Sequence, residues 1–290
     1  MAADRGRDPW DEPAGDRGRR GPGVAGGAAL TERGGGRCMR GPITARIGAG
    51  LLGAALTLGA CAPTPVVGVR PPAAAPAPVI YAAIGASETY GIGANDRYRQ
   101  AWPQVFYNDV LPPSAVLYNF GIPSATTDQA LHDEVPAAMA VHPTLVTVWL
   151  NVNDLIRGVS VADYEAELRQ LLHSLRRGGQ TQVLVANTPD LGQLPAYRAC
   201  LPNAPAGGPA CLIPDGLLPT PRAVAATVDA YNAAIGRAAR QEGATLVDLH
   251  LNDAQINQHP EWLSADGFHP SGQGYAVIAR LFEDAYHRAA

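Results

Sequence analysis

From Val79 onward, short apolar runs alternate with longer segments of helical periodicity, and this alternation limits the possible folds more than any other feature. The apolar runs are rich in β-branched and aromatic residues, which favour a pleated backbone. Each run is apolar along nearly its whole length, as is typical of parallel strands covered on both faces. The predicted strands are 79–85, 116–122, 144–150, 181–188 and 244–251.

The segments between these runs place apolar residues at three- and four-residue spacings, which predicts amphipathic helices. In one of them the apolar positions are Tyr164, Leu168, Leu171, Leu172 and Leu175. The predicted helices are 100–110, 125–140, 161–177, 221–241 and 271–286. Strands and helices in alternation indicate a single three-layer α/β/α sandwich, with a mainly parallel five-stranded sheet, over residues 79–290.

The first part of the chain has a different composition. Residues 1–38 are rich in Gly, Arg and Asp and lack apolar periodicity, so we interpret them as a disordered or mis-called extension outside the fold. Met39 then opens a segment with two arginines ahead of an uncharged apolar run at 47–60. That run is too short to span a bilayer and is typical of a secretory signal, so residues 39–60 are predicted to be a signal peptide.

The signal ends in "LGAC", which resembles the lipobox of bacterial lipoproteins and implies that Cys61 is lipidated. Met39 would then be the natural start. The alternatives are cleavage without lipidation, or an apolar stretch inside a core. Residues 61–78 are rich in Pro and Ala and predict an extended tether. We therefore expect a protein attached by lipid to a bacterial membrane surface, outside the cytoplasm.

The composition limits the classes of partner that this protein is expected to bind. With 47% hydrophobic and 17% charged residues, the chain suits a globular protein with one sizeable core. A net charge of −4 and a pI near 6.0 give no basic excess that would attract nucleic acid. We expect no nucleic-acid partner, and we expect a monomer.

Two cysteines remain once Cys38 and Cys61 are assigned to the leader and the lipid. In an oxidising compartment Cys200 and Cys211 should form a disulfide. Closing their loop would stabilise the fold by about 3 kcal/mol in the chain-entropy model. A zinc site is the weaker alternative, because the sequence has no CxxC spacing.

Polar clusters follow several predicted strands, and ligands of such folds bind at the carboxyl ends of parallel strands. Ser87 follows the first strand in "GASET". Taken alone, it is most often the N-cap of a helix, and "GASET" lacks the second glycine of the α/β-hydrolase nucleophile motif. Asp266 and His269 lie three residues apart in "DGFHP", close enough for the carboxylate to orient the imidazole as a base. The alternative for His269 is an ordinary loop histidine.

Ester hydrolysis also needs donors for a developing oxyanion. Gly121 in "NFGIPSATT" offers a backbone N–H that substrate can approach closely, and Asn153 in "NVND" offers a side-chain amide. The N–H of Ser87 would be a third donor. Simple turns are the alternatives for both Gly121 and Asn153.

Ser87, Gly121, Asn153 and the Asp266/His269 pair, in this order over residues 79–290, together resemble the SGNH or GDSL family of hydrolases. The resemblance implies a flavodoxin-like sheet, with Ser87 as nucleophile and Gly121 and Asn153 in the oxyanion hole. It also implies Asp266 as orienter, His269 as general base, and no metal ion or other cofactor. Two departures concern substrate scope: "GASE" replaces Gly-Asp-Ser-Leu, and "NVND" has Asn151 where the family has glycine.

The resemblance implies a serine esterase that acts on small-molecule, lipid or carbohydrate acyl esters through an acyl-enzyme. Transfer of the acyl group to a sugar or lipid, with the same residues, is the alternative within enzymes. A cell-surface binding module on a degenerate hydrolase fold is the alternative outside them. Acceptor choice would depend on the Pro- and Gly-rich segment 189–220, which follows the fourth strand.

Overall fold

The structure is a computed structural model that describes residues 78–214, 216–250 and 258–289. The predicted signal peptide, lipidation site and most of the tether lie outside these residues. Within the described residues, no helix is both long enough and apolar enough to cross a membrane.

In the described part of the chain, five parallel strands form one sheet in the order β2-β1-β3-β4-β5. This order puts β1 between β2 and β3. The chain therefore runs from β1 to its neighbour on one side, β2, and then crosses to its neighbour on the other side, β3. Ligands of such folds bind where the direction of the connections changes in this way. The strands are β1 (Ile80–Gly85), β2 (Val116–Asn119), β3 (Leu145–Trp149), β4 (Gln182–Ala186) and β5 (Thr245–Val247). The sequence-based prediction of a three-layer α/β/α sandwich with a mainly parallel five-stranded sheet is confirmed.

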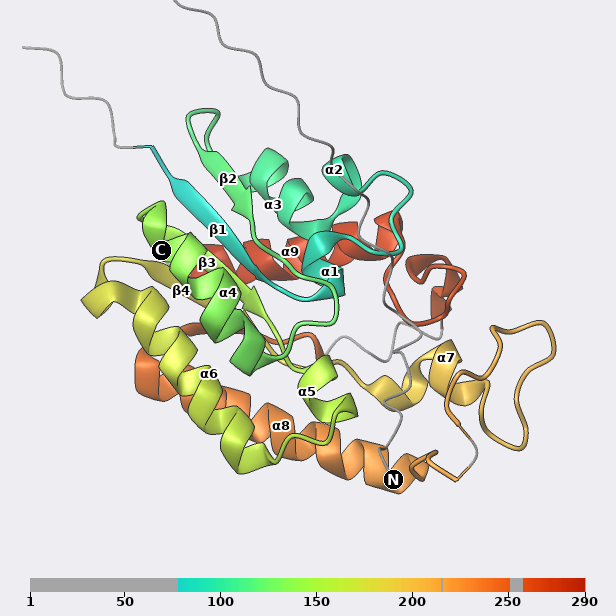
Figure 1. Ribbon diagram of the computed structural model, residues 1–290. Helices are drawn as coiled ribbons and strands as arrows, with labels where there is room; N and C mark the ends of the chain where they lie inside the picture. The colour runs from blue at the N-terminus through green and yellow to red at the C-terminus, as the bar shows by residue number, and fades with distance from the viewer. Residues whose placement is uncertain (1–77, 215, 251–257, 290) are drawn as a thin grey trace, which may run out of the picture. The chain divides into compact units, whose positions relative to one another are not determined.

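Helices cover both faces of the sheet, with α4, α6 and α8 on one face and α3 and α9 on the other (Figure 1). Side chains alternate along β1, so Ala82 and Ile84 pack into the first layer while Tyr81 and Ala83 pack into the second. The helices are α1 (Ser87–Tyr90), α2 (Arg97–Gln100), α3 (Trp102–Val110), α4 (Thr127–Ala140), α5 (Val152–Ile156), α6 (Val161–Arg176), α7 (Pro195–Arg198), α8 (Pro221–Glu242) and α9 (Gly272–Ala289).

Each predicted strand and each predicted long helix corresponds to an observed element. The five apolar positions predicted for α6 are all buried. The expectation that both faces of every strand are covered is wrong for β2, where Val116 and Tyr118 remain 40% and 39% exposed. The reason is that β2 is an edge strand and pairs only with β1.

Four short helices, α1, α2, α5 and α7, were not predicted from the sequence. They have four or five residues each, too few to show a helical period. α1 follows β1 and α5 follows β3, so both begin at the carboxyl edge of the sheet. Figure 1 shows α1 and α5 at the same end of the molecule.

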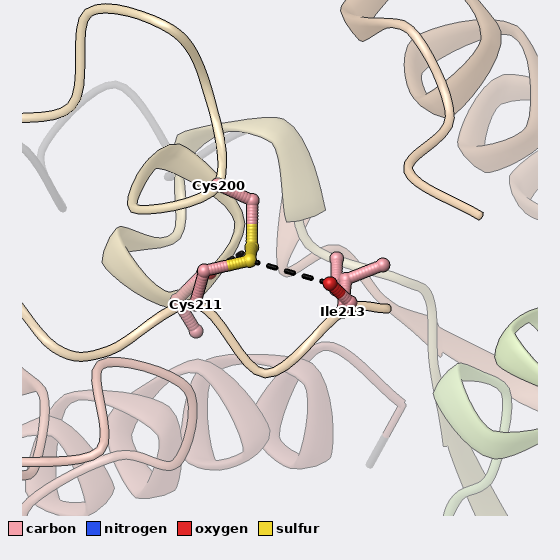
Figure 2. The surroundings of a disulfide bond; sticks show 4 residues. Cys200, Cys211 and Ile213 are labelled. Carbon is pink, nitrogen blue, oxygen red and sulfur yellow. Dashed lines mark hydrogen bonds between the residues drawn. A yellow bond between two sulfur atoms is a disulfide. The ribbon is translucent and has the colours of Figure 1, made fainter. Parts of the chain in front are cut away.

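The segment between β4 and α8 is held together by a disulfide between Cys200 and Cys211, as predicted (Figure 2). The Sγ atom of Cys211 lies 3.5 Å from the carbonyl oxygen of Ile213. The segment also contains α7 and the 3-10 turn η2 (Leu191–Gln193). Two further 3-10 turns are described, η1 (Arg177–Gly179) and η4 (Pro260–Trp262).

Candidate active site

Ser87 is the first residue of α1 and does not cap it. The N-cap position is Ala86, and no side chain makes a cap hydrogen bond there. The Ser87 side chain instead donates a hydrogen bond to Glu88 Oε2 at 3.2 Å, and the Ser87 N–H donates to no acceptor among the described residues. The structure therefore rules out the N-cap interpretation, and it leaves both the hydroxyl and the backbone N–H of Ser87 available for chemistry.

Gly85, the last residue of β1, packs closely against β3 and α1. A Cβ at this position would lie 2.7 Å from the carbonyl oxygen of Trp149 and closer still to Thr89, so only glycine fits. The Gly85 N–H donates to Glu134 Oε2 at 2.8 Å. Burial raises the pKa of Glu134 to about 8, although the hydrogen bond from Gly85 opposes this and the charge of Asp133 adds to it.

Asp266 and His269 form the predicted carboxylate–imidazole pair, with 2.7 Å between Asp266 Oδ2 and His269 Nδ1. The other carboxylate oxygen accepts from Ser264 Oγ and from the backbone N–H groups of Phe268 and His269. Burial alone would raise the pKa of Asp266, but these hydrogen bonds, that of His269 foremost, hold it well below its ordinary value. With its pKa lowered, Asp266 is ionised at neutral pH and favours a proton on His269 Nδ1, so that Nε2 of His269 can act as a base.

The segment that follows α1 packs against the segment that carries His269. A Cβ at Gly93 would lie 2.5 Å from the carbonyl oxygen of Pro270 and 3.0 Å from His269 Cβ. Tyr275 on α9 donates a hydrogen bond to the carbonyl oxygen of Ile92, which ties the two segments together. No direct hydrogen bond joins Ser87 to His269 within the described part of the chain.

Asn153 lies on α5 and faces the turn after β2. Its side-chain nitrogen donates to the carbonyl oxygen of Ala125 at 2.9 Å. An amide nitrogen has two hydrogens, so this bond leaves one for a ligand. The next residue, Asp154, accepts from the backbone N–H and the hydroxyl of Thr127 at the start of α4. Burial raises the pKa of Asp154, which those hydrogen bonds oppose.

Gly121 is close to α1, but its N–H is already used. It donates to Asn119 Oδ1 at 3.0 Å, while Asn119 Nδ2 donates to the carbonyl oxygen of Thr89. A Cβ at Gly121 would lie 2.7 Å from the Tyr90 nitrogen, so the glycine is needed for packing whatever its role in chemistry. An oxyanion would have to displace Asn119 to reach this N–H.

Ser124 is a residue that the sequence analysis missed. It has a left-handed backbone, with φ of +65°, and its N–H donates to no acceptor among the described residues. Ala125 N–H donates to Ile122 O at 3.0 Å, and Pro123 precedes Ser124, which is the pattern of a type II turn. Asn153 donates to the carbonyl oxygen of Ala125, so the N–H of Ser124 belongs to the residue just before the one that Asn153 contacts. The dipeptide Pro-Ser was a turn signal that could have pointed to it.

A mainly apolar cavity of about 90 Å³ opens beside these residues. Its lining includes the immediate chain neighbours of the predicted catalytic residues, namely Glu88, Val152, Phe268 and Pro270. Among the described residues of that lining, Glu88 is the one with an ionisable side chain, and it is only 8% exposed. A hydroxyl, a carboxylate-bound imidazole and free N–H donors at one sheet edge, next to an apolar cavity, suit acyl transfer.

The sequence model of the GDSL-like lipase/acylhydrolase family matches residues 83–277, from within β1 to within α9. A lipase/acylhydrolase from Enterococcus faecalis has a similar structure, with a TM-score of 0.53 and 18% identity over 71% of this chain and 94% of that one. The psychrotrophic esterase EstA from Pseudoalteromonas sp., solved with monoethylphosphonate as inhibitor, has a TM-score of 0.52 and 16% identity over 72% and 97% of the two chains. At these identities the likeness shows a shared fold. No curated protein matches this chain.

Proposed function

This chain belongs to the GDSL-like lipase/acylhydrolase family, and on that premise we propose that it hydrolyses acyl esters through an acyl-enzyme on Ser87. The Asp266–His269 pair carries the proposal. One oxygen of the Asp266 carboxylate binds His269 Nδ1, and the other accepts hydrogen bonds from Ser264 Oγ and two backbone N–H groups, so the carboxylate is held in the orientation that a general base requires. The hydroxyl of Ser87 does not cap the helix, and it supplies the nucleophile that such a base would deprotonate.

The reaction begins when the Ser87 hydroxyl turns from Glu88 toward His269. Nε2 of His269 takes the hydroxyl proton as Oγ bonds to the ester carbonyl carbon. The tetrahedral intermediate collapses, the bond to the leaving oxygen breaks, and His269 returns the proton to the departing alcohol. A water molecule then attacks the acyl-enzyme by the same route and releases the acid. Asp266 stabilises the imidazolium in both halves.

The oxyanion is held by the N–H of Ser87, the side-chain amide of Asn153 and a backbone N–H from the turn after β2. Gly121 and Ser124 are the candidates for this last donor. The N–H of Ser124 is favoured, because it has no acceptor among the described residues and so breaks no hydrogen bond as charge develops. Gly121 would first have to release Asn119.

Labelling with an organophosphonate tests the nucleophile directly. Residues 62–290 are expressed without the leader, treated with the probe and weighed by intact-mass spectrometry, beside a Ser87→Ala control. We expect one adduct per chain, on Ser87 by peptide mapping, and none in the control. If no adduct forms under conditions that label an established serine esterase, the hydrolase assignment fails and a binding module becomes the better interpretation.

A further inference from the structure

The segment between β4 and α8 touches the chain between Asp266 and His269. Ala196 at the start of α7 donates its backbone N–H to the carbonyl oxygen of Gly267 at 3.1 Å. Gly267 adopts φ of +67°, a conformation that the tight Asp266–His269 turn requires. The β4–α8 segment therefore binds the peptide that sets the direction of both side chains.

This contact has no spare space. A Cβ on Gly267 would lie 2.8 Å from Pro209 Cγ, 2.9 Å from Pro195 Cβ and 3.0 Å from the Ala196 nitrogen. Pro195 and Ala196 approach from α7, and Pro209 approaches from the loop that the disulfide closes. Two separate parts of the segment, α7 and the disulfide loop, thus pack against Gly267.

Pro209 is placed there by the loop between Cys200 and Cys211. Residues 202–208 and Ala210 are exposed, whereas Pro209 is half-buried. Pro209 is two residues from Cys211, and Cys200 is two residues after Arg198, the last residue of α7. The disulfide therefore ties the Pro209 contact to the α7 contact, and without it Pro209 would be held only by an open, exposed loop.

The same segment also packs against the Asn153 side of the site. Leu191, Leu194 and Tyr197 form a buried cluster with Val152, the residue before Asn153. Leu263 and Phe268, on either side of Asp266, pack against this cluster. A displacement of the β4–α8 segment would therefore shift both His269, the proposed base, and Asn153, the proposed oxyanion donor.

We propose that the Cys200–Cys211 disulfide is a positioning device for the active site, which holds Pro209 on Gly267 and so keeps Asp266 aligned with His269. This inference rests on the proposed function for its catalytic consequence. A dithiol opens the bridge by exchange: two electrons and two protons pass to the cysteines, which become thiols, and the reductant becomes a disulfide. Cys211 is exposed, so the bridge is accessible to such a reductant.

Two variants and one matched control test the proposal. Cys200→Ser/Cys211→Ser removes the bridge, and Pro209→Ala keeps the bridge but removes the ring that touches Gly267. Pro205→Ala is the control, since it changes a proline of the same loop that is exposed. If the double variant does not fold, Pro209→Ala and the wild-type protein before and after dithiol treatment decide the result.

The first readout does not depend on turnover. The His269 Nδ1 proton in its short bond to Asp266 should give a low-field proton NMR resonance, assigned by its loss in Asp266→Asn. We expect this resonance to shift upfield or broaden in the double variant, in Pro209→Ala and in reduced wild type, and to stay unchanged in Pro205→Ala. Unchanged resonances in all of them would overturn the proposal, as would equal changes in the two proline variants.

The second readout is ester turnover. We expect kcat of the double variant to fall about tenfold with KM nearly constant, because misplacement of a catalytic group affects the reacting geometry more than binding. Pro209→Ala should lose less in the same direction. A loss in KM alone would contradict a positioning role. If oxidised wild type neither turns over esters nor takes the phosphonate, the proposed function fails, and the NMR resonance still decides the role of the disulfide.

Discussion

The backbone conformation of Ser124 makes it a candidate oxyanion donor. A left-handed conformation costs a non-glycine residue about 1–2 kcal/mol, yet Ser124 adopts it at the turn that meets Asn153. The Ser124 N–H, in the turn after β2, has no hydrogen-bond partner among the described residues. Such strain at a turn with a free donor is consistent with a binding role for that donor.

Substitution at Ser124 separates the two candidate donors. Ser124→Gly accepts φ of +65° without strain, so we expect kcat close to wild type and an unfolding free energy that does not fall. Ser124→Val opposes that angle, so it should displace the N–H and lower kcat about tenfold with little change in KM. Steady-state kinetics on an aryl ester measure this. Wild-type kcat in a folded Ser124→Val protein would favour Gly121 instead.

Asn153 offers a second prediction at the same scale. Its amide has one hydrogen on Ala125 and one available for the oxyanion. Asn153→Ala should lower kcat by roughly 10²- to 10³-fold while KM changes little, because the bond forms only as charge develops. Single-turnover acylation rates check this. A purified variant with unchanged turnover would remove Asn153 from the mechanism.

At the scale of elements, the site depends on how helices are joined to strand ends. Glu134 on α4 accepts from Gly85 at the end of β1, and Asp154 on α5 accepts from Thr127 at the start of α4. These buried carboxyl groups connect three elements through backbone N–H groups. They hold α1, α5 and the turn after β2 in fixed relation, which is what a preorganised oxyanion site requires.

Glu134 makes the stability of this connection depend on pH. Its pKa rises from 4.5 to about 8 on folding, so between these values the folded chain holds a proton that the unfolded chain has released. The unfolding free energy should therefore be highest below the lower value and fall as pH rises through the higher one, by at most about 1.4 kcal/mol per pH unit.

Glu134→Gln should flatten this dependence, because an amide does not titrate in that range. Urea unfolding at several pH values measures it, with Asp284→Asn as a control at an exposed position on α9. A Glu134→Gln variant whose stability falls with pH as steeply as wild type would show that another group is responsible.

At the scale of the whole molecule, the location of the protein is still a proposal. We propose that Cys61 carries a lipid and that the Pro-rich tether places the hydrolase domain at a bacterial membrane surface. The full chain, expressed in a bacterium that processes lipoproteins, should appear in the membrane fraction. Cys61→Ser should move it to the soluble extracytoplasmic fraction, with esterase activity retained. Equal membrane retention of both would contradict lipid anchoring.

The strands, the long helices and the residue pairs that are close along the chain could be predicted from the sequence. Apolar periodicity indicated all five strands and the long helices, because burial imposes a spacing that each element displays locally. The three-residue separation of Asp266 and His269 was enough to predict their bond, since a turn brings such neighbours together. The Cys200–Cys211 disulfide was also predicted correctly, because the assignment of Cys38 and Cys61 to the leader and the lipid left these two cysteines as the remaining pair.

Which backbone and side-chain groups are engaged in hydrogen bonds could be seen only in the folded chain. The Gly121 N–H is engaged by Asn119, the Ser124 N–H has no described partner, and Ser87 is not a helix cap. The contact of Pro209 with Gly267 joins positions far apart in the sequence. Such features depend on which distant segments the fold brings together. Local composition and spacing do not predict them, because the close packing of side chains from remote segments is set by the whole chain.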